Sequence, residues 1–337
     1  MAMVTGDPAL EGMGPDGAEP QTPEEPKAIE GRSLRQIAVS RLKRDKATLA
    51  AMTVAGLFVL TAILAPILVK LKILDPLTNH QDLINADSSP KGSWGGMSAE
   101  HWLGVVPGSG TDTLSRLLYG ITFSVVVGLC ATLVAVIIGL VVGLASGFAG
   151  GKVDFLGTRL IDLVLCFPQT LMLLALSGTF IARIKSMGVS DDNVAAGIYV
   201  ILVLGLFGWP TFARIIRGQV MTLRNREFVE AARSLGATNK RVYFTELLPN
   251  LWAPILVYAT LLFPAFVSAE AALSYLTVGI KAPTPTLGNI ITDSVNYLNQ
   301  DPLYFFAPVF TIAALVLSFN LVGDGLRDAL DPKADRH

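Results

Sequence analysis

The 337-residue chain has little charge and almost no cysteine. Asp, Glu, Lys and Arg together make up 16% of it, against 52% hydrophobic residues, and its mean hydropathy is +0.54. A soluble protein with so little charge would lack the polar surface that keeps it dispersed, so a membrane protein is indicated. The two cysteines, Cys130 and Cys166, both lie in apolar runs. They do not indicate a disulfide framework, and we interpret them as small core residues.

Sequence patterns for catalysis and for metal binding are also lacking. The stretch 147–153 superficially resembles a phosphate-binding loop, but Ser146 stands at the first glycine position and Val153 at the hydroxyl position. A β-strand before that loop is impossible inside a membrane span, and no nucleophile elbow or zinc-protease pattern is present. The spacing of His80 and His101 fits no metal-binding pattern, so we expect a folded loop there. We therefore predict that this chain is no enzyme and holds no cofactor or metal.

Six apolar runs account for most of the sequence. A bilayer core needs about 20 residues in helical form. The runs comprise residues 47–69, 117–151, 163–182, 194–213, 251–280 and 305–323. Pro168 lies in the first half of the third run, Pro210 lies near the end of the fourth, and Glu270 is the one charge in the fifth. The sequence predicts an all-α membrane protein with six transmembrane helices.

The basic residues predict the orientation of these spans. They gather just before the first span, between the fourth and fifth, and after the sixth, which are regions on one side of the membrane. Because Lys and Arg are enriched in cytoplasmic loops, we expect both termini in the cytoplasm. The predicted regions are a disordered acidic tail at 1–31, a basic cytoplasmic pre-helix at 32–46, the first span at 47–69, an extracytoplasmic loop at 70–116, the remaining core at 117–327 and a cytoplasmic tail at 328–337.

One predicted cytoplasmic segment, 224–249, is patterned as a short docking helix followed by a second helical stretch. We expect Asn225 to cap the first helix, Glu227 to lie in its first turn and Gly236 to end it in a left-handed conformation. Apolar residues recur at i, i+3, i+4 and i+7 as Phe228, Ala231, Ala232 and Leu235. So short a stripe needs a supporting surface, which favours docking against a protein. A solvated basic loop near anionic lipid head groups is the alternative.

Two features inside the spans call for an explanation. Glu270 places a costly carboxyl within a span, so a role in a substrate path or proton relay stands against that of a structural carboxyl bonded to a neighbouring helix. Gly139, Gly143 and Gly147 recur every four residues in the second span. Small residues at this spacing let two helices pack closely, within the subunit or against a partner. The general abundance of glycine in membrane helices is the alternative.

Several motifs resemble those of one transporter family. Glu230-Ala231-Ala232, followed by Gly236 and Leu248-Pro249, resembles the EAA loop of ABC-importer permease subunits, with Glu246 in place of the usual isoleucine. Three further stretches resemble the C-type permease of dipeptide, oligopeptide and nickel importers, at 101–120, 270–288 and 320–332. The sequence departs from that pattern at Val105, Val106, Thr111 and Leu287. These departures concern the outer face and therefore the substrate class.

The resemblance implies a MetI-like permease of the type I importers, with a cytoplasmic coupling helix, in the bacterial cytoplasmic membrane. Its implied partners are a second homologous permease, two ABC ATPase subunits that hold ATP and magnesium, and an extracytoplasmic substrate-binding protein, with no nucleic acid. The implied ATPase-coupling residues are Arg226, Glu227, Phe228, Glu230, Ala231, Ala232, Leu235 and Gly236.

The cargo implied by the resemblance is a di- or oligopeptide. Nickel or another small solute is the alternative within the same class of importer. An ion-coupled secondary transporter that uses Glu270 is the rival from another class, although an acid at this position belongs to the family pattern.

Overall fold

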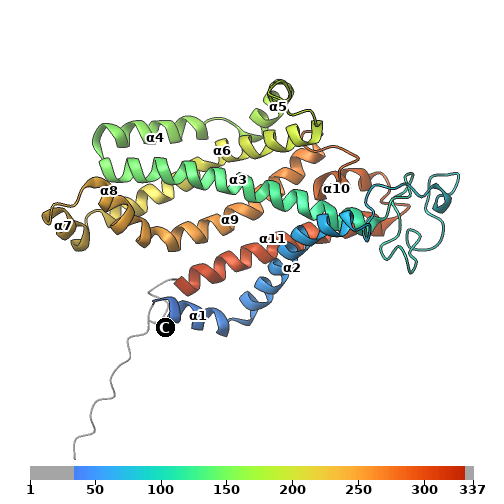
Figure 1. Cartoon of the computed structure of the whole chain (residues 1–337), viewed down its shortest axis with the longest axis horizontal. Coiled ribbons are helices and arrows are strands. Elements are labelled where there is room, and N and C mark those ends of the chain that lie inside the picture. The colour runs from blue at the N-terminus through green and yellow to red at the C-terminus, as the bar shows by residue number, and fades with distance from the viewer. Residues whose placement is uncertain (1–33, 331–337) are drawn as a thin grey trace, which may run out of the picture. The chain divides into compact units, whose positions relative to one another are not determined.

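The computed structural model describes residues 34–330, and within them helices are the main secondary structure (Figure 1). The predicted tail at 1–31 lies outside these residues, as do residues 331–337. The helices in chain order are α1 (Leu34–Arg44), α2 (Lys46–Lys70), the 3-10 helix η1 (Gln81–Leu83), α3 (Thr113–Ala149), α4 (Gly151–Leu165), α5 (Gln169–Ser186), α6 (Asp192–Leu223), α7 (Glu227–Ser234), α8 (Asn239–Arg241), the π-helix η2 (Val242–Leu247), α9 (Leu248–Tyr275), α10 (Leu287–Val295) and α11 (Pro302–Leu330).

The predicted all-α membrane fold is confirmed. Five continuous helical segments within 34–330 are long and apolar enough to cross a membrane, namely α2, α3, α6, α8 to α9, and α11. A bent pair, α4 and α5, makes a sixth crossing if it is counted as one span. Each predicted span overlaps one of these elements.

The predicted third span, 163–182, is not one continuous helix. α4 ends at Leu165, α5 begins at Gln169, and their axes differ by 80°. Pro168 immediately precedes α5, where its missing N–H and its ring prevent a helix from continuing. Cys166 lies exposed at this break, so its interpretation as a core residue is wrong, and both it and the half-buried Cys130 are free thiols.

Helices α3 and α6 form the centre of the bundle and run side by side (Figure 1). The three glycines of α3 all face α6. A Cβ on Gly139 would lie 2.7 Å from Phe212 Cδ1, and a Cβ on Gly143 would lie 2.8 Å from the Ala213 carbonyl oxygen. At Gly147 the nearest atoms are the Arg217 carbonyl oxygen and Val220 Cβ, each at 2.8 Å. Only residues without a side chain allow the two backbones to approach this closely.

Ion pairs fasten α4 to α6. Arg217 donates two hydrogen bonds to Asp154, of 2.5 and 2.9 Å, and Arg214 donates one of 2.9 Å to Asp162. α6 continues to Leu223, beyond the predicted end of its span at Ala213, and both arginines lie on this continuation. A bidentate arginine–carboxylate pair fixes orientation as well as distance. The end of α6 is thereby held against both α3 and α4.

The opposite end of the bundle carries the irregular segment 71–112 together with α10. Asp112 joins that segment to α3, because one carboxyl oxygen caps the helix at the Ser115 N–H and the other lies 2.9 Å from His101 Nδ1. The rings of His80 and His101 lie 5.6 Å apart. Within residues 34–330 no group of three or more His, Cys, Asp or Glu side chains is placed to hold a metal ion.

Candidate functional site

The docking segment lies at one end of the bundle, beyond the ends of α3 and α6 (Figure 1). Its helix, α7, runs from Glu227 to Ser234, with Arg226 in an extended conformation just before it. The predicted cap, Asn225, is wrong, because Arg226 occupies the capping position and makes no side-chain capping bond. Glu227 and Glu230 both lie in the first turn, where an acid is favoured by the helix dipole.

The two faces of α7 have different surroundings. Phe228, Ala231 and Leu235 are exposed, and Leu235 retains 89% of its accessible surface. Val229 is fully buried, and Ala232 is half-buried on the same side. The predicted stripe therefore points mostly away from the bundle, and a second stripe, offset by one residue, supports the helix. An apolar face left open on a short helix is typical of a surface for another protein.

Val229 joins α7 to the core. It belongs to a buried cluster with Val220 of α6, Val242 of η2 and Leu251 of α9. Phe148, at the end of α3, packs on Tyr243 with ring centres 4.4 Å apart. The Arg233 guanidinium lies 4.8 Å from the centre of the Phe148 ring, which adds a cation–π contact from α7. These contacts connect α7 with α3, α6 and α9.

Gly236 ends α7 as the sequence predicted, with φ of +83°. The Gly236 N–H donates to the Arg233 carbonyl, and the Ala237 N–H donates to the Ala232 carbonyl. This pair of bonds is a Schellman motif, which favours glycine because its left-handed residue is strained when it carries a side chain. A Cβ at Gly236 would meet no atom within 4 Å, so the conformational requirement alone selects glycine.

The chain returns to the membrane through a π-helix. Thr238 caps α8, and η2 then leads without a break into α9. Pro249 lacks an N–H, and the Leu248 N–H bonds the Tyr243 carbonyl in the π pattern. The Asn250 side chain donates to the Glu246 carbonyl at 2.6 Å. Glu246, the departure from the EAA pattern, thus lies half-buried in this π turn.

Glu270 lies far from α7 and is buried between α3, α9 and α10. Ser124 and Ser274 each donate a hydroxyl hydrogen bond to its carboxyl, at 2.8 and 2.9 Å. The Leu287 N–H donates to the Ser124 hydroxyl at 3.2 Å, which includes the start of α10 in the network. Each carboxyl oxygen has a partner, and this geometry favours the structural interpretation over a transport role.

Sequence reasoning missed the residues that hold α7 in place. Val229, Phe148 and Arg233 were not candidates, and neither were the pairs that Asp154 and Asp162 make with α6. Val229 and Ala232 have the same i, i+3 spacing as Phe228 and Ala231, so the pattern was visible in the sequence. Periodicity shows that two stripes exist and does not show which one faces inward.

Comparison with known proteins identifies sequence relatives over nearly the whole chain. Residues 135–336 match the family described as binding-protein-dependent transport system inner membrane component, and residues 33–90 match the N-terminal TM domain of oligopeptide transport permease C. The chain is 35% identical to the dipeptide transport system permease protein DppC of Alkalihalophilus pseudofirmus, over 94% of this chain and 95% of the relative. It is 36% identical to the oligopeptide transport system permease protein OppC of Escherichia coli K12, over 90% and 93%.

A solved structure supports the fold. The chain is similar to a chain of the inward-facing MetNI methionine ABC transporter, with a TM-score of 0.51 and 18% sequence identity. The match covers 64% of this chain and 96% of the other. At this level of identity the similarity concerns the helical arrangement alone.

Proposed function

Because the chain belongs to the family of inner membrane components of binding-protein-dependent transport systems, we propose that it forms part of the translocation pathway of an ATP-driven importer of di- or oligopeptides. The membership makes it an ABC-importer permease subunit. The peptide cargo is supported by the names of its relatives, which are dipeptide and oligopeptide permeases. The main structural support for this mechanism is α7, a short helix whose outer face is exposed and whose inner face is buried against the bundle.

The proposed complex contains three kinds of partner. A second homologous permease completes the pathway, two ABC ATPase subunits hold ATP and magnesium, and an external binding protein delivers the cargo. The α7 end then faces the cytoplasm, together with both termini, and the end with segment 71–112 faces outward. The basic residues around α7 support this orientation.

In this proposal α7 is the contact for an ATPase subunit. Phe228, Ala231 and Leu235 supply the exposed apolar surface, and the neighbouring coupling residues supply charge and the helix stop. The coupling residues in full are Arg226, Glu227, Phe228, Glu230, Ala231, Ala232, Leu235 and Gly236.

Movement of the ATPases is then passed into the membrane through the inner face of α7. Val229 and the Arg233–Phe148 contact connect α7 to α3, and the buried cluster connects it to α6 and α9. A shift of α7 therefore changes the tilt of three spans together. Transport requires that ATP binding and hydrolysis favour different tilts of these spans, because a ligand shifts only an equilibrium between states that it binds unequally.

Uptake by the assembled complex tests this function. The complex is reconstituted in proteoliposomes with its binding protein, and entry of radiolabelled trialanine is measured with and without internal or external ATP. We expect uptake only when ATP reaches the α7 side, and no dependence on an ion gradient. Uptake driven by an ion gradient without ATP would support the secondary transporter instead. ATP-driven uptake of nickel with no uptake of trialanine would reassign the cargo and leave the importer class intact.

A further inference from the structure

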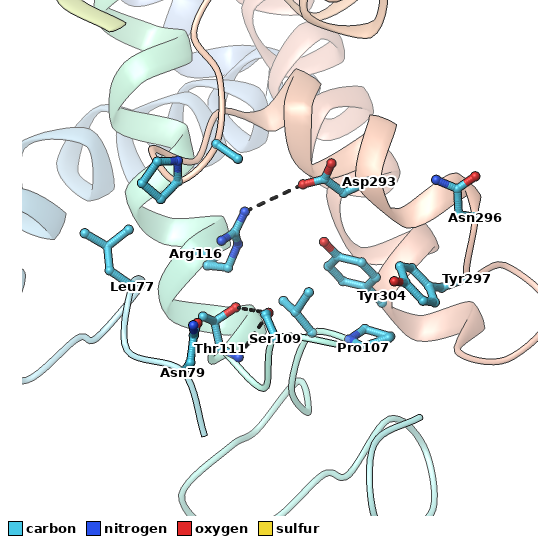
Figure 2. A pocket seen from close by; sticks show the side chains of 13 residues that line it. Leu77, Asn79, Pro107, Ser109, Thr111, Arg116, Asp293, Asn296, Tyr297 and Tyr304 are labelled. Atoms are coloured by element: carbon cyan, nitrogen blue, oxygen red, sulfur yellow. Dashed lines mark hydrogen bonds and ion pairs between the residues drawn. The ribbon is translucent and has the colours of Figure 1, made fainter. Parts of the chain in front are cut away.

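A pocket at the end of the bundle opposite α7 contains an incompletely paired arginine (Figure 2). The cavity has a volume of about 520 Å³ and lies between the first turn of α3, segment 77–111 and the region of α10 and α11. Arg116 of α3 enters it from one side, and Asp293 of α10 lies on the opposite wall, with 3.8 Å between Nη2 and Oδ2. Tyr297 and Tyr304 form an aromatic wall beside them.

The Arg116 guanidinium is buried without the hydrogen bonds that such a group requires. Its side chain is 8% exposed, and its Nε has no hydrogen-bond partner among the described residues. The Tyr304 hydroxyl lines the same cavity, is fully buried and likewise has no partner in the described part of the chain. A buried charged donor without a partner is costly, and more so than a neutral one. The pocket is therefore prepared to receive an acceptor.

Asp293 does not supply the missing hydrogen-bond acceptor for the Arg116 guanidinium. Its distance of 3.8 Å is longer than a hydrogen bond, and its side chain is 46% exposed, so much of its charge is solvated. It is also held in place. The capping box of Thr286 and Asn289 fixes the start of α10, and a Cβ on Gly288 would lie 2.6 Å from Ala271 Cα, so α10 rests directly on α9. The start of α10 is thereby fixed, with Asp293 at 3.8 Å from the guanidinium.

The arrangement of donors and acceptors selects a particular chemical group. A carboxylate matches the fork of the guanidinium at Nε and Nη2, and it also accepts from a hydroxyl such as that of Tyr304. A water molecule would satisfy one donor and leave the charge unbalanced. Asp293 repels a doubly charged phosphate more strongly than a singly charged carboxylate, and it favours an N–H group beside the carboxylate. The last residue of a peptide presents a carboxylate and an N–H next to each other.

We propose that this pocket binds the terminal carboxylate of a short peptide at Arg116, as an outer subsite of the importer. The inference rests on the proposed function, since it takes a peptide as the cargo. The last peptide N–H faces Asp293, and the final side chain lies against the partly exposed Tyr297. The volume falls within the range of about 300–1,000 Å³ typical of small-ligand sites, which is compatible with the end of a peptide.

The test compares two probes, trialanine and trialanine amide, which differ only in the terminal charge. Uptake of each is measured in proteoliposomes with the assembled complex and saturating binding protein, for the wild type and for Arg116→Gln. The quantity of interest is the ratio of acid uptake to amide uptake, compared between the two proteins. The binding protein is the same throughout, so its own preference cancels. We expect Arg116→Gln to lower this ratio about tenfold or more, as for a lost charge-assisted hydrogen-bond pair.

Two further variants control for folding and for surface charge. Tyr304→Phe removes only a hydroxyl that has no partner in the described structure, so it keeps the packing, and we expect it to lower the ratio about threefold. Lys91→Gln removes an exposed basic side chain from the same end of the molecule, outside the pocket, and we expect the ratio to stay unchanged. Assembly of each variant is followed by purification with the other subunits.

The outcomes separate the pocket from the cargo assignment. An unchanged ratio in Arg116→Gln and in Tyr304→Phe, with trialanine still imported, overturns this inference and leaves the proposed function standing. Failure of the wild type to import trialanine in any form overturns the peptide assignment first. Equal losses for acid and amide, accompanied by weaker binding of the external binding protein, would show that the pocket receives an acidic side chain of that protein, and would also overturn the proposal.

Discussion

Replacing Val229 by alanine should detach α7 from the bundle while leaving its outer face unchanged. Val229 is fully buried, in contact with a cluster drawn from α3, α6, η2 and α9. Removing two methyl groups forfeits about 0.8 kcal/mol each in burial, plus a smaller cost for the cavity, which gives about 2 kcal/mol in all. That free energy is lost from the docked state of α7, since the exposed side of the helix does not change.

The change is measurable as local opening. With about 1.4 kcal/mol for each factor of ten, a loss of 2 kcal/mol raises the open population of α7 about 30-fold. Hydrogen exchange of the assembled complex, followed by mass spectrometry, should show this increase in residues 227–237 and in η2, which packs on the same cluster. Uptake of peptide per ATP hydrolysed should fall, because ATPase movement no longer reaches α3 and α6.

Phe228→Ala is the matched control. Phe228 is 38% exposed and lies on the outer face of α7. We expect this variant to weaken the ATPase contact and to reduce uptake without faster exchange in η2. If Val229→Ala exchanges within twofold of the wild type in both segments, or if Phe228→Ala accelerates η2 equally, the division of α7 into an anchoring face and a docking face is wrong.

Three further substitutions test other parts of the structure. Gly236→Ala should cost about 1 kcal/mol at φ +83°, without a steric clash, and should lower uptake per ATP while the complex still assembles on size-exclusion chromatography. Gly143→Leu should prevent assembly of the complex, because even its Cβ would lie 2.8 Å from the Ala213 carbonyl oxygen; normal yield would contradict this. Burial raises the pKa of Asp301, so the folded state binds its proton more tightly and gains stability as the pH falls from above that pKa toward the usual value of 3.8. In Asp301→Asn the thermal unfolding temperature should not show this rise in stability as the pH falls. A pH profile identical to that of the wild type would argue against the effect of Asp301.

The apolar runs predicted the helical spans because a bilayer admits few other structures. Their ends were harder to predict. α6 continues past Ala213, and on this continuation Arg214 and Arg217 pair with Asp162 and Asp154 of α4. A charged side chain near a membrane span is better tolerated when a side chain of another helix pairs with it. The sequence around Arg217 does not indicate which residue that partner is.

Two prolines with similar sequence surroundings gave different outcomes. Pro168 stands at an 80° break, whereas Pro210 remains inside α6. Pro210 is buried beside Trp209, whose carbonyl lies against Gly139, so close packing on α3 holds α6 together there. α5 has little comparable burial. The local effect of proline was predictable, but whether a neighbouring helix compensates for it was not.

The coupling segment was predictable in position and only partly in geometry. Gly236 has the predicted left-handed conformation, because glycine after an apolar periodic segment is a strong local signal. The orientation of α7 depends instead on contacts between distant segments, such as that of Arg233 with Phe148, which lies 85 residues earlier in the chain. The coupling role of the exposed residues stays a prediction for the experiments above.

Glu270 restricts the order in which the helices can be assembled during synthesis. Its partner Ser274 lies on the same helix, but Ser124 belongs to α3, which leaves the ribosome first. When α9 enters the bilayer, a hydroxyl from α3 is already available for a carboxyl that hydrocarbon alone would exclude. α10 follows directly and supplies the Leu287 N–H. When the helices insert in chain order, the Glu270 carboxyl therefore has a hydrogen-bond partner as soon as α9 enters the bilayer.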